Sequence, residues 1–377
     1  LRNATDEYEI ECWRHYGYGI KKPYSKFVNG ILHRVFPAKQ IIIPKLGKYL
    51  WSGSLYKQLV YEIKHNNVIL VVFVGHAWFH IILQLKLRRI KKSFGLIDIH
   101  LSSGFKKLAH QKLSPVKKLI KFYYLIEHYL DIKFIGVSDI YYSGSQIEAK
   151  YLQEKHPELH SEYFMGGIDF SQYRILSSVE KNKLRNELGL PTDKNLFIVH
   201  GNWRSNDYSY EPLIECYKRI KENGKADNLQ MVMIGGHKSE DLYQKAIEAN
   251  IIMIERCTKD RFIKYLEAGD FFGKPNLNYA FINFGGFGFS TIEALACGLP
   301  ILTNNIIHFP GNDLEREKIG LDMPTETQME EGIIKLNNSF KHYCECRSIA
   351  EKHFNINKTN TVLINKFKEL EGKYFQK

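Results

Sequence analysis

Residues 283–300 read NFGGFGFSTIEALACGLP. The glycines at 285, 286 and 288 allow positive φ angles and a close approach of the backbone to a ligand. A helix is expected to begin directly after them, and its unpaired N–H groups and positive dipole end favour an anion such as a pyrophosphate. Glu293, about one turn into this helix, is placed to accept hydrogen bonds from both hydroxyls of a ribose. A glycine-rich loop that only packs tightly is the alternative interpretation.

Apolar strand patterns alternate with helical patterns on both sides of this segment. In the second half of the chain, strands are expected at 196–200, 230–234, 251–254, 270–272 and 301–303, and helices at 211–222, 239–249, 259–268 and 290–297. In the first half, strands are expected at 68–74, 96–100 and 133–137, and helices at 51–64, at 80–90, after 114–115 and from about 146. Two successive series of this kind predict two doubly wound parallel sheets, an α/β fold.

The change from one series to the other falls near residues 169–191, where glycines at 166 and 167 and a polar stretch interrupt the pattern. The expected domains are an N-terminal one over residues 1–175, a C-terminal one over 176–350, and a last helix over 351–377 that packs back on the N-terminal domain. Residues 1–14 look like the end of a helix followed by a second strand. We therefore expect the first βα unit of the N-terminal domain to be missing from this chain.

The composition is that of a folded protein: 44% of the 377 residues are apolar and 25% are charged. Apolar runs are shorter than the roughly 20 residues that span a bilayer. The six cysteines are scattered without a CxxC pair, and no cluster has the spacing of metal ligands, so neither a disulfide scaffold nor a metal site is expected. We find no signal-peptide pattern. These features favour a cytoplasmic protein with reduced thiols.

The chain is basic, with 53 Lys and Arg against 41 Asp and Glu and a net charge of +12. An anionic membrane, a phosphorylated substrate or nucleic acid would each fit this excess, but no nucleic-acid-binding module is recognisable. A basic helix is expected after residues 114–115, with Lys117, Lys118 and Lys121 beside an apolar face. Such a helix favours binding to an anionic membrane surface, peripherally. An ordinary core-facing helix with a lysine-rich outer side is the alternative.

The glycine-rich segment resembles the signature of retaining GT-B glycosyltransferases of family 4 (glycosyl transferases group 1). That signature reads E-G-F-G, four further residues and a second Glu, then A-x-A-C-G-x-P. The sequence matches it at Gly286, Phe287, Gly288, Glu293 and within 294–300. Further landmarks follow in the family's order at residues 97–100 (IDIH), 136–138 (GVS) and 166–169 (GGID). The resemblance covers about residues 50–310.

The resemblance implies two Rossmann-like domains that face each other across a cleft. It implies transfer of a hexose from a UDP- or GDP-sugar to a glycan or lipid-linked acceptor, with retention and without a metal or cofactor. Glu293 would bind the ribose, and His100 would reach the transferred sugar or the acceptor from the opposite domain; a satisfied strand-end histidine is the alternative. The donor-binding residues implied are Arg204, Glu255, Arg256, Cys257, Gly286, Phe287, Gly288, Phe289, Ser290 and Glu293.

The sequence departs from the family pattern at positions that normally contact the donor. Gly285 stands where the signature has its first Glu, and Asn202 and Asp207 stand where an Arg and a Lys are usual. On that loop Arg204 is the cation that could meet a pyrophosphate, since a guanidinium matches phosphate geometry. A degenerate GT-B protein that binds a nucleotide sugar without turning it over is therefore the second hypothesis.

Overall fold

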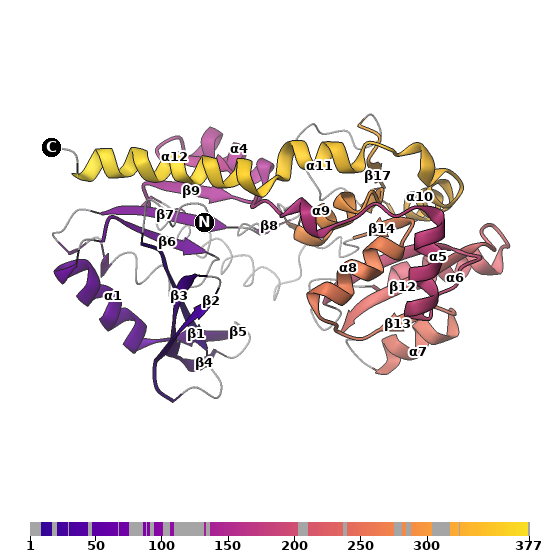
Figure 1. The fold of residues 1–377 in the computed structure, drawn as a ribbon, viewed down its shortest axis with the longest axis horizontal. Helices are drawn as coiled ribbons and strands as arrows, with labels where there is room; N and C mark the ends of the chain where they lie inside the picture. The colour runs from indigo at the N-terminus through magenta and orange to yellow at the C-terminus, as the bar shows by residue number, and fades with distance from the viewer. Residues whose placement is uncertain are drawn as a thin grey trace.

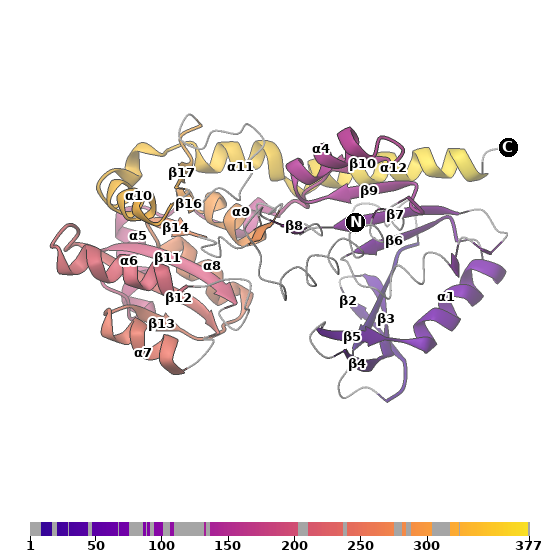
Figure 2. The same ribbon diagram turned by 180° about the vertical axis from the view of Figure 1, so that it is seen from behind.

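The computed structural model describes most of the chain. The described residues are 9–16, 21–28, 30–43, 47–66, 68–74, 86–87, 89–90, 94–100, 106–108, 132, 136–202, 210–236, 240–274, 281–283, 288–303, 317–323 and 325–375. They form two α/β units that lie side by side, each built around its own parallel sheet (Figure 1). The last helices run along one side of both units, which is also seen from behind (Figure 2).

The C-terminal unit contains a six-stranded sheet in the order β13-β12-β11-β14-β16-β17, and every pair in it is parallel. Its strands are β11 (Asn195–Asn202), β12 (Leu229–Gly236), β13 (Ile252–Ile254), β14 (Phe271–Gly273), β16 (Ile301–Thr303) and β17 (Gly320–Asp322). After β11 the chain adds strands on one side, and from β14 onward it adds them on the other. The order of strands therefore reverses between β11 and β14, which makes this position a topological switch point.

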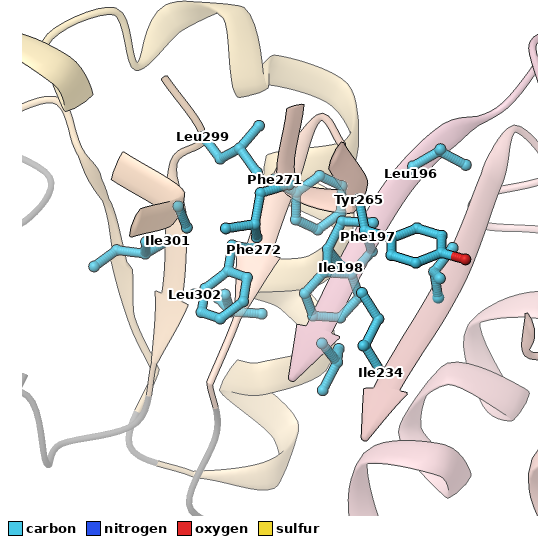
Figure 3. Close-up of a cluster of buried hydrophobic side chains, with 14 of the residues drawn as sticks. Leu196, Phe197, Ile198, Ile234, Tyr265, Phe271, Phe272, Leu299, Ile301 and Leu302 are labelled. Atoms are coloured by element: carbon cyan, nitrogen blue, oxygen red, sulfur yellow. The ribbon is translucent and has the colours of Figure 1, made fainter. Parts of the chain in front are cut away.

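Helices cover both faces of this sheet, and the middle parts of its central strands are accordingly apolar. The helices of the unit are α5 (Ser178–Leu188), α6 (Glu211–Glu222), α7 (Glu240–Glu248), α8 (Lys259–Ala268), α9 (Phe289–Ala296), α10 (Glu326–Ser339) and α11 (Cys346–Phe354). The rings of Phe197 and Phe271 stack with their centroids 4.7 Å apart, and Ile198, Phe272 and Leu302 belong to the same buried cluster (Figure 3). This core holds the strand ends of the sheet in fixed positions.

The helices of this unit begin in two different ways. Thr258 caps α8 by accepting a hydrogen bond from the backbone N–H of Arg261 (3.4 Å), and Ser177 and Glu180 form a capping box on α5. The N-cap of α9 is Gly288, with a φ of 76° and no side-chain hydrogen bond. The first N–H groups of α9 are thus left for another partner.

The N-terminal unit has a four-stranded parallel sheet in the order β10-β9-β7-β6. Its elements are β6 (Leu70–Val74), β7 (Gly95–His100), β9 (Ile140–Ser143), β10 (Ser161–Tyr163), α1 (Gly53–His65) and α4 (Gln146–Lys155). Of the strand predicted at 133–137, Gly136 and Val137 lie in a turn instead, and residues 133–135 lie outside the described residues; the next described strand is β9. The carboxylate of Asp139 accepts a hydrogen bond from the backbone N–H of Leu96 (2.8 Å). This bond fixes the chain beside β7 just before β9 begins.

Five further strands precede this sheet in the chain: β1 (Glu11–Tyr16), β2 (Tyr24–Val28), β3 (Ile31–Pro37), β4 (Lys39–Ile43) and β5 (Gly47–Trp51). Strands β2 and β3 form a hairpin whose register places Val28 opposite Ile31. The sequence between them is Asn29-Gly30, the strongest short signal for a two-residue hairpin turn, and Gly30 has a φ of 80°. The hairpin therefore has a readable sequence signal of its own, although it falls outside the alternating α/β pattern.

The chain passes between the two units twice, and the two passages lie together. The backbone N–H of Ile168 donates to Phe354 (2.9 Å), and that of Ile356 donates to Ile168 (3.1 Å). Helix α12 (Ile356–Phe375) then packs Leu363, Phe367 and Leu370 against the N-terminal sheet. Strands β8 (Lys106–Leu108) and β15 (Phe281–Asn283), one from each half of the chain, also form an antiparallel pair. No helix in the described part of the chain is both long and apolar enough to cross a membrane.

Candidate functional site

The carboxyl ends of β11 and β14 lie next to each other at the switch point of the C-terminal sheet. His200 lies near the end of β11, and Lys274 follows directly after β14. The backbone N–H of Lys274 donates to the carbonyl of Leu302 in β16 (3.1 Å), which fixes the residue at this edge. Helices α8 and α9 begin at the same edge. Ligands of open α/β sheets bind in the crevice that forms at such a point.

Glu293 lies on the first turns of α9 and is 6% exposed. Its carboxylate accepts a short hydrogen bond from the ammonium group of Lys259, the first residue of α8, and the two form an ion pair. The same ammonium lies over the rings of Tyr173 (5.7 Å) and Phe262 (5.8 Å). Burial and the neighbouring Glu293 carboxylate raise the pKa of Tyr173, so its hydroxyl stays protonated. The buried carboxylate is therefore held by one cation beside two aromatic rings.

Lys274 is mostly buried, and its ammonium group lies against Gly288 at the start of α9. A Cβ atom on Gly288 would overlap Nζ of Lys274, so the glycine supplies the space that the ammonium occupies. Burial lowers the pKa of Lys274, and the negative charge of Glu293 opposes that change. The carboxylate of Glu293 is paired with Lys259 and not with Lys274.

His200 contributes a neutral side chain to the same edge. Burial, together with the positive charges of Lys274 and Lys259, lowers the pKa of His200 from 6.5 to about 4. Its ring lies 4.4 Å from that of Phe262, between centroids. The imidazole is uncharged at neutral pH, so it can donate one hydrogen bond and accept another without adding charge.

The described part of this edge has more positive than negative charge. Two ammonium groups and the positive end of α9 face a single carboxylate, and the neutral His200 does not change the balance. The hydroxyls of Thr291 on α9 and Thr303 at the end of β16 are buried without a hydrogen-bond partner among the described residues. Such a site is suited to an anion with several hydrogen-bond acceptors, such as a diphosphate.

The structure brings some of the predicted site residues together. Gly288, Ser290 and Glu293 lie at the start of α9, with Ser290 9% exposed, and Phe289 between them is more exposed. The exposed Glu255 and Arg256 and the half-buried Cys257 follow β13, at the carboxyl edge of the same sheet. Gly286, Phe287 and Arg204 lie outside the described residues, as do Gly285 and Asp207, while Asn202 is the last residue of β11.

The remaining predictions concern the N-terminal unit. His100 is the last residue of β7, at the carboxyl end of that strand, but its side chain lies outside what the structure describes. Lys117, Lys118 and Lys121 lie outside the described residues as well. In the described part of the chain, no three His, Cys, Asp or Glu side chains are grouped as metal ligands.

Sequence reasoning missed Lys259, Lys274 and His200. Each had a readable signal: His200 and Lys274 come at the ends of apolar strand runs, and Lys259 follows Thr258, a good N-cap residue before a helical pattern. What the sequence did not provide was the strand order. The structure pairs β14 with β11, and this pairing brings residues 200 and 274 to the same edge of the sheet.

Comparisons with known proteins concern the sequence family and the fold. Residues 180–353 match the family model described as Glycosyl transferases group 1. No curated protein matches the chain significantly. Among solved structures, trehalose 6-phosphate synthase from Burkholderia multivorans is 11% identical, with a TM-score of 0.67 over 96% of this chain and 90% of that one.

Two other similar structures were solved with ligands. HepE from Anabaena, in complex with UDP and glucose, is 13% identical, with a TM-score of 0.61 over 90% of this chain and 87% of that one. The Escherichia coli trehalose-6-phosphate protein bound with UDP-2-fluoro glucose is 9% identical, with a TM-score of 0.66 over 94% of this chain and 91% of that one. The chain therefore adopts the GT-B glycosyltransferase fold, two Rossmann-like domains with parallel sheets, and its residues 180–353 are similar in sequence to the glycosyl transferases group 1 family.

Proposed function

We propose that this protein is a retaining glycosyltransferase of family 4 that moves a hexose from a UDP- or GDP-sugar to a glycan or lipid-linked acceptor, in the assembly of a cell-surface polysaccharide or glycolipid. The observation that carries the proposal is the buried Glu293 on α9, one turn from Gly288, at the switch point of the C-terminal sheet. A carboxylate at this position suits the two hydroxyls of a ribose, and the helix start beside it suits the phosphates. The UDP and UDP-sugar in similar structures fit this assignment.

The proposed reaction uses no metal or cofactor. Transfer leaves a nucleoside diphosphate, whose developing charge must be stabilised at the site. In this proposal the start of α9, the glycine-rich sequence before it and the cations at the sheet edge provide that stabilisation, with Arg204 as a further cation from the sequence after β11. The sugar would be attacked on the face that the phosphate leaves, and the phosphate would accept the proton of the acceptor hydroxyl. His100 would position the sugar or the acceptor from the N-terminal domain.

The acceptor side of the proposal concerns the N-terminal unit. A lipid-linked acceptor would place the protein peripherally on the inner face of a membrane, in a cytoplasmic location. The segment with Lys117, Lys118 and Lys121 has the sequence of a basic amphipathic helix, which suits an anionic lipid surface. We propose no nucleic-acid partner.

A second candidate function is a degenerate GT-B protein that binds a nucleotide sugar without turnover. It is favoured by Gly285 in place of the signature Glu and by Asn202 and Asp207 in place of the usual cations. The ion pair between Lys259 and Glu293 also occupies the carboxylate that the ribose would need. The two candidates share a binding site and differ in turnover.

The experiment is a thermal-shift screen of the protein against UDP, GDP, ADP and their sugars, followed by a hydrolysis assay with the donor that binds. A ligand that binds only the folded state adds about 2.7 kcal/mol of stability at 100 times its Kd. A shift with one nucleotide and slow hydrolysis of its sugar would support the glycosyltransferase. A shift without any hydrolysis would favour the degenerate candidate, and the absence of a shift with every nucleotide would refute both.

A further inference from the structure

Two lysines lie at the switch-point edge, and only one of them is neutralised by a described residue. Lys259 is paired with Glu293, the one carboxylate that lies between them. Lys274 faces the start of α9, where the helix dipole is positive, and no described residue accepts a hydrogen bond from its ammonium group. A mostly buried ammonium group beside the positive end of a helix costs free energy in the unliganded protein, and a bound anion would offset that cost.

The space around Lys274 shows where an anion would fit. Gly288 has no Cβ, and the ammonium group occupies the place where a Cβ would be. The N-cap position of α9 has no side-chain acceptor for the first N–H groups. A diphosphate at this point would meet an ammonium group and free backbone N–H groups together.

Of Lys274, Lys259 and His200, Lys274 is the one whose positive charge is available to an anion. His200 is neutral at pH 7, so it can add hydrogen bonds but no charge. The ion pair between Lys259 and Glu293 would have to break before Lys259 could bind an anion. The switch point lies between β11 and β14, and Lys274 is the first residue after β14, with its ammonium group against Gly288 at the start of α9.

We infer that Lys274 is a residue that binds the diphosphate of the donor, in a chain where Asn202 and Asp207 stand in place of the family's usual Arg and Lys. The inference rests on the proposed function and assigns a role in it to a residue that the signature motif does not contain. In this role the ammonium holds the leaving phosphate, while Glu293 holds the ribose on the same helix.

The test is titration calorimetry on the full chain with three probes: UDP, uridine and inorganic pyrophosphate, with GDP and guanosine if UDP does not bind. The variant is Lys274→Met, which keeps the length of the side chain and removes its charge. The control is Lys181→Met, because Lys181 is also a mostly buried lysine of this unit, but it pairs with Asp270 at the opposite edge of the sheet (3.4 Å). The melting temperature of each variant is measured alongside.

Lys274→Met is expected to lower the affinity for UDP about 10- to 100-fold, the loss of one charge-assisted hydrogen bond, and to abolish pyrophosphate binding. The affinity for uridine should stay within about twofold, and the melting temperature should not fall, because a desolvated charge is removed. Lys181→Met should leave all three affinities unchanged. A merely structural role for Lys274 would instead lower the melting temperature and leave the ratio of UDP to uridine affinity unchanged.

The remaining outcomes separate the inference from the proposed function. If the wild type binds UDP and Lys274→Met binds it equally well, the inference is wrong and the proposed function stands. If the wild type binds pyrophosphate through Lys274 but no nucleotide, the anion site is supported and the proposed function is refuted. Binding of neither pyrophosphate nor any nucleotide would overturn both.

Discussion

The ammonium group of Lys259, at the start of α8, is ion-paired with the carboxylate of Glu293, on α9. The two residues are not equally exposed: the side chain of Glu293 is 8% exposed and that of Lys259 is 49% exposed. The lysine can therefore move into solvent, whereas the carboxylate is fixed by its helix. A ligand that hydrogen-bonds to Glu293 would displace Lys259 and would meet a carboxylate already in position.

Glu293→Gln should weaken nucleotide binding by about 1–3 kcal/mol, because an amide accepts weaker hydrogen bonds from ribose hydroxyls than a carboxylate does. Calorimetry with the nucleotide found in the thermal-shift screen measures this loss. The control is Glu267→Gln, since Glu267 is an equally buried, paired carboxylate of this unit that contacts Arg174 (2.8 Å) away from the site. Unchanged affinity in Glu293→Gln would remove Glu293 from the nucleotide site.

Lys259→Met should raise the affinity for the nucleoside without its phosphates. A half-exposed ion pair is worth roughly 0.5–1 kcal/mol, so a ribose that need not break it should bind about two- to fivefold more tightly. Uridine or guanosine is the probe, and the double variant with Glu293→Gln should lack the gain. A lower affinity in Lys259→Met would show that the lysine itself contacts the nucleoside.

His200 should make the folded protein sensitive to acid. Its pKa is lowered from 6.5 to about 4 by burial and two lysines, so the unfolded chain takes up a proton at a higher pH than the folded one. The stability that this provides is fully present above about pH 6.5 and is lost as the pH falls to about 4, by about 3 kcal/mol.

His200→Asn removes the titrating group and keeps a polar side chain. The difference in unfolding free energy between wild type and variant, measured in urea at several pH values, should therefore change between about pH 6.5 and 4 and be constant above about 7. The exposed His65, changed to Asn, is the control. Parallel pH profiles for wild type and His200→Asn would contradict a buried neutral histidine.

Much of the fold could be predicted because each strand and helix carries its own periodic signal. The buried run of β12 and the amphipathic pattern of α8 are local properties, and the prediction of α8 at residues 259–268 is confirmed. The strand predicted at 133–137 does not extend over Gly136 and Val137, which lie in a turn, and the aromatic residues Tyr141 and Tyr142 are the ones buried in β9. When the residues before and after a short strand are also apolar, the sequence does not show where the strand begins or ends.

The site was predictable only where one segment contains it. Gly288 and Glu293 lie five positions apart, so the helix joining them was visible in the sequence. Lys274, His200 and Lys259 come from three other elements, and they meet because β11 and β14 are neighbours in the sheet. Pairing of distant strands depends on the packing of the whole unit, which no single segment encodes.

The basic segment near residue 117 offers a test of the membrane proposal. Reversing the charge at Lys117, Lys118 and Lys121 to Glu should abolish binding to anionic vesicles, since each cation near such a surface contributes about 1 kcal/mol. Sedimentation with vesicles that contain an anionic lipid measures this, and neutral vesicles are the control. If the wild type stays in solution with anionic vesicles, the membrane proposal is wrong.

Helix α12 should be essential for the stability of the N-terminal unit. Phe367 is 6% exposed and lies in one cluster with Ile97, Ile99 and Tyr142 of the sheet, so Phe367→Ala would leave a cavity. We expect a loss of about 3–5 kcal/mol in unfolding free energy, measured in urea. Val362→Ala on the same helix is the control, because Val362 is 48% exposed and its truncation should cost less than about 0.5 kcal/mol. Equal effects of the two substitutions would mean that α12 does not pack on the sheet in solution.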